Sequence, residues 1–324
     1  MSSPTVATLS NALAWSLSGI AGMGAACVAY GVLIERRWFR TARYTLPVLP
    51  PGVTEPVTVL HLSDLHFVRR DPQKARFLAG LPSTDLTVVT GDVLAEPEAV
   101  EGAVEALRPV RGRLGSYFVL GSNDLFAPRP LNYLAYFFPR RKARVGRRGR
   151  PRELVAQLEG DGWEHLKNRR TGLNRNEVRF EVMGLHDPHI ERHDLRVAPR
   201  MDPHAVGVAV VHAPDPAPEL AALGYDLILS GHTHGGQVRL PLVGALVTNS
   251  SIPRRLCMGL SRLGPALLHI SPGLGTSKYA PFRFLCRPEA TILDLVARPA
   301  GPMTRQRVSA TAGMASPAGT APSG

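Results

Sequence analysis

Short apolar runs alternate with amphipathic stretches through the central part of the chain. Two of these stretches, residues 71–81 and 97–107, carry apolar positions at helical spacing. The apolar runs have the length of buried strands and are followed by polar or glycine residues. They are residues 57–62, 86–90, 117–120, 206–211 and 225–229. This alternation predicts repeated βα units in a layered α/β fold with mostly parallel strands.

A polar cluster follows each predicted strand. Asp64 and His66 follow the first strand, Asp92 follows the second and His212 follows the fourth. Because the carboxyl ends of parallel strands meet at one edge of a sheet, we expect these side chains to lie together. Burying so many unpaired carboxylates and imidazoles would be costly, and both groups are ligands of divalent metals. The sequence therefore predicts a metal site at this edge.

The stretch that most strongly indicates a metal site is residues 230–237, Ser-Gly-His-Thr-His-Gly-Gly-Gln. His232 and His234 are two positions apart, too close for one helical face, but on a glycine-flanked turn they can point at two adjacent cations. A pair of this kind taken alone also fits two ordinary surface histidines. The four clusters upstream make a metal site the better interpretation.

In order, the motifs D-x-H, G-D, a glycine turn with Asn and Asp, a lone His and G-H-x-H resemble the calcineurin-like metallophosphoesterase family over residues 56–296. The Gly-His-Thr-His-Gly-Gly-Gln version is similar to the membrane-associated bacterial phosphohydrolase branch. The resemblance implies a four-layer α/β/β/α sandwich. It also implies hydrolysis of a phosphomonoester or phosphodiester, with two divalent metal ions sharing the hydroxide that attacks phosphorus.

The resemblance also implies a role for each ligand. Asp92 bridges the two ions and is the catalytic carboxylate, while an amide oxygen joins the second ion. We expect Mn²⁺, although mixed nitrogen and oxygen ligands also suit Fe or Zn²⁺. The expected ligands are Asp64, His66 and His234 for the first ion, His212, His232 and Asn123 for the second, and Asp92 for both.

One motif departs from the family pattern of Gly-Asn-His-Asp or Glu, because residues 121–124 read Gly-Ser-Asn-Asp. Either Asn123 supplies the amide ligand, or Ser122 takes its place and binds weakly. Both readings lack the histidine that would protonate the leaving group. The side chains that could replace it are Asp124, which we take as the catalytic candidate, His186 and His189.

Two features near the C-terminal end of the domain could bind the phosphate of a substrate. Arg283 and Arg287 are candidate anion clamps. Residues 271–277 form a glycine turn with hydroxyl groups, which could present backbone amides to phosphate, although such turns are common.

The N-terminal region has the pattern of a membrane anchor. Residues 12–34 are apolar, no charged residue precedes Glu35, and four arginines follow by residue 43. A cleaved signal peptide would carry a basic segment before the apolar run, so we favour a transmembrane helix. The arginines after the helix place the catalytic domain in the cytoplasm of a single-pass cell-membrane protein.

The remaining boundaries follow from composition. Residues 1–43 form the anchor with its basic flank, and the proline-rich residues 44–56 form a stiff linker. The phosphoesterase domain covers residues 57–298, with a basic aromatic insertion at 128–152. Residues 299–324, rich in Ala, Pro, Ser and Gly, form a disordered tail.

The net charge of +12 favours anionic partners, and eight of the 38 Lys and Arg residues lie between 140 and 152. Tyrosines and phenylalanines precede this cluster, so the insertion could pack as a loop, contact lipid headgroups or stack nucleic acid bases. The three cysteines lack C-x-x-C spacing, which argues against a disulfide framework or a zinc knuckle.

The sequence thus predicts a membrane-anchored metallophosphoesterase whose substrate is a phosphoester, including a phospholipid or lipid-linked phosphate, with no specific nucleic acid partner. Two other interpretations remain open. The altered motif at 121–124 would fit a catalytically silent scaffold on the same fold. The basic segment would fit a nucleic-acid-binding protein, whose affinity should fall steeply with salt.

Overall fold

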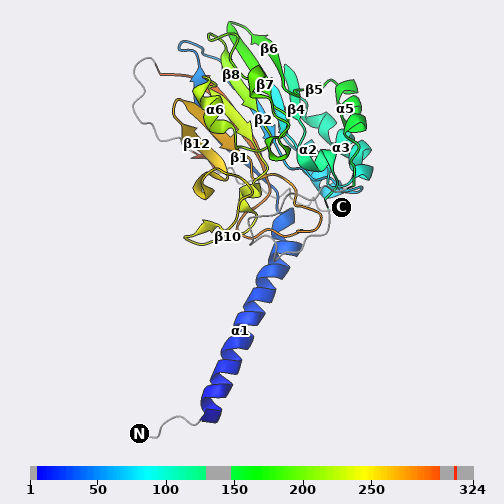
Figure 1. Cartoon of the computed structure of the whole chain (residues 1–324), viewed down its shortest axis with the longest axis vertical. Helices are drawn as coiled ribbons and strands as arrows, with labels where there is room; N and C mark the ends of the chain where they lie inside the picture. Colours follow the sequence, from blue (N-terminus) through cyan, green and yellow to red (C-terminus); the bar gives the residue numbers. More distant parts are fainter. Residues whose placement is uncertain (1–5, 129–146, 300–309, 312–324) are drawn as a thin grey trace, which may run out of the picture.

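The computed structural model describes residues 6–128, 147–299 and 310–311 of the 324-residue chain, with side chains from residue 15 to 128 and from 147 to 299. Within these residues the chain forms two facing β-sheets, with helices on both outer sides and one long helix, α1, projecting from the domain (Figure 1).

The first sheet has seven strands in the order β15-β1-β14-β2-β3-β4-β5. Strands β2 to β5 are parallel, whereas β14 runs antiparallel to β2 and parallel to β1. Its strands are β1 Arg40–Leu49, β2 Val57–Leu62, β3 Leu86–Thr90, β4 Gly115–Val119, β5 Glu164–His165, β14 Glu289–Ala297 and β15 Ala310–Thr311.

The second sheet has six strands in the order β12-β13-β9-β8-β7-β6, and a separate hairpin pairs β10 with β11. Strands β7, β8, β9 and β13 are parallel, and the two outer strands are antiparallel to their neighbours. The strands are β6 Arg169–Arg175, β7 Val178–Gly184, β8 Val206–Val210, β9 Leu227–Ser230, β10 Arg239–Leu240, β11 Gly244–Ala245, β12 Gly259–Leu263 and β13 Ala266–Ile270.

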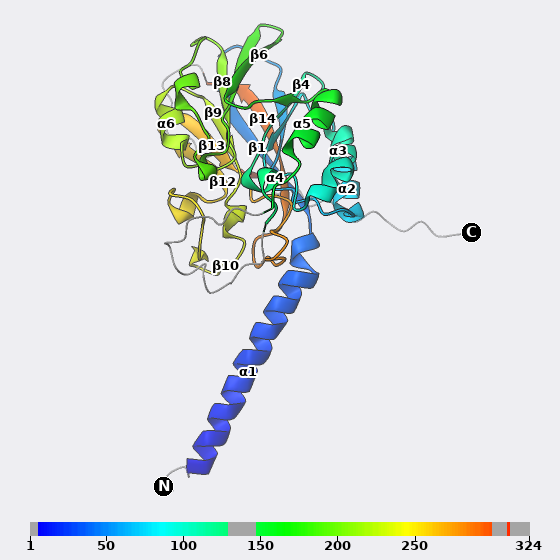
Figure 2. The same cartoon turned by 45° about the vertical axis from the view of Figure 1, so that its right-hand side comes forward.

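Helices cover both outer faces, which confirms the predicted α/β/β/α sandwich (Figures 1 and 2). Alternation along the strands builds this layering. In β2, Val57 and Val59 pack between the sheets, while Leu60 and Leu62 pack against the helices of the first sheet. Those helices are α2 Pro72–Ala79, α3 Val100–Leu107 and α5 Pro151–Gly160; α6 Ala217–Ala222 covers the second sheet, and α4 Ser122–Leu125 is a short turn after β4.

The predicted linker at 44–56 is wrong in its first part, because residues 40–49 form β1. This strand pairs with β14 along almost its whole length, from Arg40 opposite Glu289 to Leu49 opposite Ala297. Leu46 and Leu49 are fully buried. The prolines misled the prediction, since Pro47 is tolerated near the irregularity that shifts the register after it.

The direction of β1 decides which end of the domain α1 approaches. Because β1 runs opposite to β2, its first residue lies at the edge where β2, β3 and β4 end. Helix α1, Val6–Leu33, reaches that edge directly through one 3₁₀ turn, Glu35–Arg37. The helix therefore meets the domain at the edge where the polar clusters were predicted.

Buried polar contacts fix this junction. Glu35 is buried, and its carboxylate accepts hydrogen bonds from the amides of Leu285 and Cys286 at 2.9 and 2.6 Å. The Tyr30 ring packs edge-on against Phe284. From residue 15 onward, α1 is mostly exposed beyond these contacts. Residues Trp15–Arg37, with a mean hydropathy of 1.8, are long and apolar enough to cross a membrane.

Two predicted segments fall mostly outside the described residues. They are the basic aromatic insertion at 128–152, of which residues 129–146 are not described, and the tail at 299–324. The three cysteines, at 27, 257 and 286, are free thiols.

The position of β1 predicts where a folded domain can begin. A chain that starts at residue 35 should unfold cooperatively, whereas one that starts at residue 50 should lose its tertiary structure. Removing three buried apolar side chains of β1, Leu46, Val48 and Leu49, costs about 5–9 kcal/mol, which is comparable to the ~5–15 kcal/mol stability of a whole domain. Near-ultraviolet circular dichroism during heating distinguishes the two chains, and equal melting temperatures would contradict the assignment of β1 to the core.

Candidate metal centre

The predicted ligands converge at the edge where strands of both sheets end. Asp64 and His66 follow β2, Asp92 follows β3 and Asn123 lies in the turn after β4. From the second sheet, His212 follows β8, and His232 and His234 follow β9. All are buried or partly buried. Two groups of these side chains have ligand atoms within 4.8 Å of one another: Asp64, His66 and His234, and Asp64, Asp92 and His212.

Several of these residues adopt a backbone conformation that side chains usually avoid. Five have a φ angle between 44° and 68°, in the left-handed region. Such conformations cost free energy and are retained where the surrounding structure holds a functional side chain in place. They turn the chain after β2, β3 and β9, so that the side chains point into one site. The five residues are Asp64, His66, Asp92, His232 and His234.

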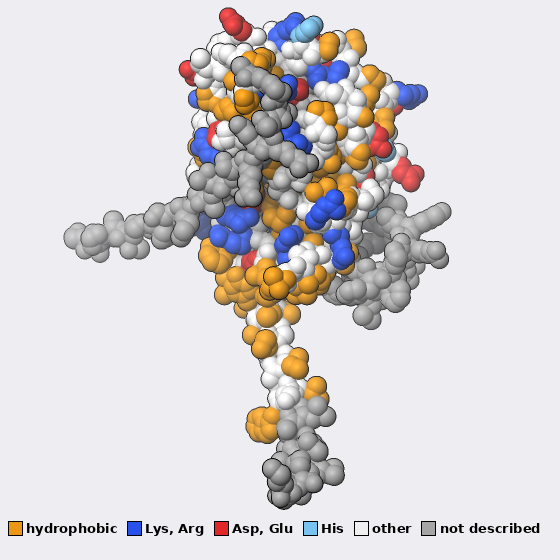
Figure 3. Space-filling view, turned by 90° about the vertical axis from the view of Figure 1, so that its left-hand side faces the viewer, with side chains coloured by type: hydrophobic (Ala, Val, Ile, Leu, Met, Phe, Trp, Pro, Cys, Tyr) orange, Lys and Arg blue, Asp and Glu red, His pale blue; other side chains and the backbone are white. Residues whose placement is uncertain are grey.

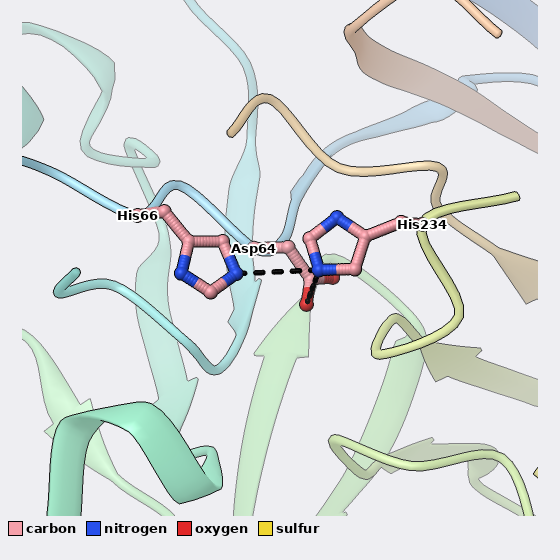
Figure 4. Close-up of side chains that lie close together, drawn as sticks. All are labelled: Asp64, His66 and His234. Atoms are coloured by element: carbon pink, nitrogen blue, oxygen red, sulfur yellow. Dashed lines mark hydrogen bonds and ion pairs between the residues drawn. The ribbon is translucent and has the colours of Figure 1, made fainter. Parts of the chain in front are cut away.

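The first cluster brings two imidazoles and a carboxylate face to face (Figure 4). The Nε2 atoms of His66 and His234 lie 3.3 Å apart, and His234 Nε2 lies 3.6 Å from Asp64 Oδ1. Two nitrogens bound to one tetrahedral ion at about 2.1 Å lie about 3.4 Å apart. Among the described residues Asp64 Oδ1 is buried without a hydrogen-bond partner. The cluster therefore fits a divalent cation.

The second cluster surrounds the other side of Asp92. His212 Nε2 lies 3.5 Å from Asp92 Oδ1, and His66 Nε2 lies 3.6 Å from Asp92 Oδ2. The two carboxylate oxygens thus face histidines of different clusters. His232 Nδ1 is 3.3 Å from His212 Nε2. This arrangement places Asp92 where a carboxylate could be shared by two ions.

Backbone carbonyls select which ring nitrogens are free to bind a metal. His212 Nδ1 donates to the carbonyl of Thr90 at 2.7 Å, which leaves Nε2 as the free nitrogen. His232 Nε2 donates to the carbonyl of Asn249 at 3.0 Å, which leaves Nδ1. In each case the free nitrogen is the one that faces the cluster. No sequence signal pointed to Thr90 or Asn249, because any residue can offer a carbonyl.

Burial sets the protonation of most ligands. It lowers the pKa of His66 to about 4 and that of His232 to about 3, against the attraction of Asp92, so both rings are neutral at pH 7. Burial, assisted by repulsion from Asp92, raises the pKa of Asp64 to about 6. For His212, burial opposes the charged form, but attraction to Asp92 and Asp187 outweighs it and raises the pKa.

In the altered motif, Asn123 contacts Asp92 through both its backbone and its side-chain amide. The backbone amide of Asn123 donates to Asp92 Oδ1 at 2.8 Å, and its side-chain amide donates to Asp92 Oδ2. Rotation about χ2 exchanges the nitrogen and oxygen of that amide group. Asn123 is therefore positioned to supply an amide oxygen to the second cluster.

The catalytic role of Asp124 stays a prediction, and the structure shows a supporting role for its carboxylate. Asp124 is fully buried, and its carboxylate accepts from the amides of Leu94 and Gly121 at 2.9 and 3.0 Å. It therefore ties together the loops after β3 and β4. His186 is buried, and its Nδ1 accepts from the amide of Asp187. His189 is exposed, with its ring 4.5 Å from that of His232.

The expected anion clamps, Arg283 and Arg287, bind backbone instead. Arg283 is fully buried and donates to the carbonyls of Pro272, Gly273, Gly275 and Cys286. Arg287 donates to the carbonyls of Trp38 and Phe39 and lies over the Trp38 ring. Charge alone could not distinguish these roles, because a guanidinium satisfies carbonyls as well as phosphates.

The glycine turn at 271–277 does not offer its central amides to phosphate. The amides of Leu274 and Gly275 donate to the carbonyls of Ser63 and Asp64. A Cβ at Gly273 would lie 2.6 Å from Asp64 Cβ, and one at Gly275 would lie 2.6 Å from His66 Cβ. The turn therefore supports the first cluster, and only glycine allows this close approach.

These protonation states predict how metal affinity depends on pH. As the pH falls through about 6, Asp64 takes up a proton and Asp64 Oδ1 loses its charge, so the affinity for Mn²⁺ should fall by up to about tenfold per pH unit. The raised pKa of His212 acts in the same direction, because that ring must lose a proton to bind. Titration calorimetry at about pH 7.5 and about pH 5.5 measures this change. Asp64→Asn should bind Mn²⁺ weakly, and its affinity should depend less on pH. A wild-type Mn²⁺ affinity that stays constant over this pH range would contradict the assignment of Asp64 as a ligand.

A family model and curated relatives match the chain in sequence. Residues 57–236 match the family model described as calcineurin-like phosphoesterase. Phosphodiesterase YaeI of Escherichia coli is 26% identical over 81% of this chain and 90% of its own length. A Bos taurus "Transmembrane protein with metallophosphoesterase domain" is 29% identical over 78% of this chain and 55% of its own. Calcineurin-like phosphoesterase YfkN of Bacillus subtilis, a solved structure, is 13% identical over 68% of this chain and 83% of its own, with a TM-score of 0.39.

The family model covers more than half of the chain, and it ends just after the His232 and His234 turn, so it contains every ligand that the two clusters use. The chain belongs to the calcineurin-like phosphoesterase family and is a hydrolase that acts on phosphoester bonds.

Proposed function

We propose that this hydrolase is anchored in a membrane by α1 and uses two divalent metal ions to cleave a phosphoester at the membrane surface. The observation that carries the two-ion proposal is the position of Asp92, whose two oxygens face His66 and His212 from different clusters. The proposed first ligand set is Asp64, His66, His234 and Asp92, and the second is His212, His232, Asn123 and Asp92.

Bound divalent ions would supply a water nucleophile at neutral pH and neutralise charge on the phosphoryl oxygens. The chain contributes orientation and desolvation. Ser63 Oγ donates to Asp64 Oδ2 at 2.6 Å and the His232 amide donates to it at 2.9 Å, so only Oδ1 is left to face a ligand. Mn²⁺ is our first choice, because metal availability rather than the ligand set usually decides which ion binds, and the mixed nitrogen and oxygen set also suits Fe or Zn²⁺.

The anchoring proposal is supported by the exposed surface of α1. Apolar residues such as Ile20 and Met23 face solvent, where a soluble helix would carry polar groups. At about 1.5 Å per residue, the 23 residues of Trp15–Arg37 extend about 34 Å, enough for a bilayer core. The arginines at the domain end of the helix favour a cytoplasmic domain.

The substrate class follows from this placement. Because α1 enters the domain at the metal-site edge, phosphoesters in lipid headgroups or lipid-linked phosphates come within reach of the clusters. The basic aromatic insertion was expected to assist, but most of it lies outside the described residues. We therefore rest the lipid-substrate proposal on the junction of α1 with the domain.

The role of Asp92 has a direct test. Asp92→Asn should lose most bound metal together with at least about a hundredfold of the rate on an aryl phosphodiester, because one substitution removes a charge from both sites. Metal content by mass spectrometry and rates with added Mn²⁺ are measured on the same preparation. The control is Asp294→Asn, which removes a carboxylate from an exposed pair with Arg43. Full activity after exhaustive chelation would contradict the mechanism.

The two readings of the altered motif predict opposite rankings. If Asn123 is the ligand, Asn123→Ala should lower metal occupancy and rate by about ten- to a hundredfold, whereas Ser122→Ala should change either by less than about threefold. The contact of the Asn123 amide with Asp92 is the reason for this order. Metal titration and initial rates decide between them, and a larger effect at Ser122 would show that the serine is the ligand.

A further inference from the structure

The β10–β11 hairpin exposes apolar side chains at the end of the domain from which α1 emerges. The turn residues Leu242 and Val243 are 109% and 64% exposed, and Leu240 and Leu246 on either side are also exposed. Figures 1 and 2 place β10 at the α1 end of the domain, and Figure 3 shows hydrophobic side chains gathered there. We call these four residues the apolar hairpin. An exposed apolar cluster of this kind marks a contact surface.

The backbone of Leu242 strengthens this interpretation. Its φ angle is +64°, in the left-handed region, where glycine or asparagine is the favoured residue. Its side chain is fully exposed, so it gains nothing from packing within the domain. Both the local conformation and the solvent therefore disfavour leucine here, and strain of this kind is typical of functional positions.

The root of the apolar hairpin is hydrogen bonded to the segment that docks α1. The amide of Arg239 donates to the carbonyl of Phe284, and the amide of Phe284 donates to that of Gln237. The Phe284 ring packs against Tyr30 of α1, and the neighbouring Leu285 is exposed. An apolar surface thus continues from the end of α1, across Leu285, to the apolar hairpin.

The exposed charges next to the apolar hairpin are basic. Residues 227–288 contain seven Lys and Arg and no Asp or Glu, although Arg283 is buried and Lys278 pairs with Glu96. Arg254 and Arg255 are exposed, and Arg254 donates to the carbonyl of Leu246 in the hairpin. Apolar side chains flanked by exposed arginines are typical of surfaces that lie in the interface of an anionic bilayer.

From these observations we infer that the apolar hairpin lies in the interfacial layer of the bilayer that α1 spans, among anionic lipid headgroups. The occupant of this surface is lipid rather than a second copy of the chain, because α1 carries the surface to the membrane and the two apolar surfaces are continuous. This inference rests on the proposed anchoring. It adds a second contact that orients the domain, with the metal-site edge facing the headgroups.

The orientation has a consequence for the substrate. His234 is only five residues before Arg239, where the hairpin begins, and Cys286 Sγ donates to the His234 carbonyl at 3.2 Å. The segment that touches the membrane is therefore attached directly to the first ligand cluster. A phosphoester in a headgroup would reach the cluster without leaving the bilayer surface, whereas a water-soluble substrate would have to enter beneath the domain.

The test places a fluorescent label at single cysteines on the full-length chain in nanodiscs of phosphatidylcholine and phosphatidylglycerol. Cys27→Ala removes the cysteine of α1, and Cys257 and Cys286 are buried. In this background the label is attached at Leu242→Cys, at Met23→Cys in the exposed face of α1, or at Met201→Cys. Met201 is the matched control, because it is 76% exposed and precedes β8, at the opposite end of that strand from His212.

Quenching by lipids that carry a spin label near the headgroup should be at least about twofold stronger at position 242 than at position 201. For position 23, which lies inside the proposed bilayer span, the quenching lipid carries its spin label in the acyl chain. Acyl-chain quenching at 23 without headgroup quenching at 242 would overturn the hairpin inference and leave the anchor intact. Absence of acyl-chain quenching at 23 would refute the proposed anchoring itself. A blue-shifted label at 242 without lipid quenching would mean that protein covers the hairpin, and it would also overturn the inference.

A second variant separates membrane contact from folding. Leu242→Asn combined with Val243→Ser places a residue suited to left-handed φ in the turn and removes the apolar surface. With the label moved to Leu240→Cys, quenching should fall to the level of position 201, while the melting temperature should not decrease. Unchanged quenching in this variant would contradict the inference.

Discussion

The structure depends on one electrostatic constraint: two buried carboxylates and four buried or half-buried imidazoles are held within a few ångströms of each other. Asp92 stands at the centre, between His66 and His212. Burial alone would drive such groups to neutral forms, and it does so for His66 and His232. The strained backbone at five ligand positions keeps the groups together in spite of this cost. Metal binding is the chemistry that makes the arrangement favourable.

The support around this cluster explains several residues whose charge suggested another role. Asp124 holds two loop amides, and Arg283 holds the carbonyls of the glycine turn that packs on Asp64 and His66. Charged side chains are the strongest hydrogen-bonding groups available for buried backbone. Where many strands end at one site, many backbone groups there lack a partner within a sheet. Charged side chains such as Asp124 and Arg283 bind those groups, so in the sequence they resemble catalytic or substrate-binding residues.

The same supporting segment joins the metal centre to α1. Residues 282–286 pack on the end of the helix. Two of their backbone amides donate hydrogen bonds to the Glu35 carboxylate, and Cys286 Sγ donates to the His234 carbonyl. The helix is therefore part of the site's architecture as well as the proposed membrane anchor. A rigid junction of this kind fixes the orientation of the metal-site edge relative to α1, which a flexible linker would not do.

Sequence alone indicated the family, the layered fold and the candidate metal ligands, because each follows from a local pattern: an apolar strand followed at once by a short polar motif at the sheet edge. It also identified α1 by length and apolarity. Only the tertiary structure showed the place of β1, the contact of Asn123 with Asp92, and the backbone partners of Asp124, Arg283 and Arg287. Each of these depends on partners remote in sequence, such as β14 or the carbonyls of another loop. Those partners are backbone groups or apolar surfaces, which carry no signature in the order of residues.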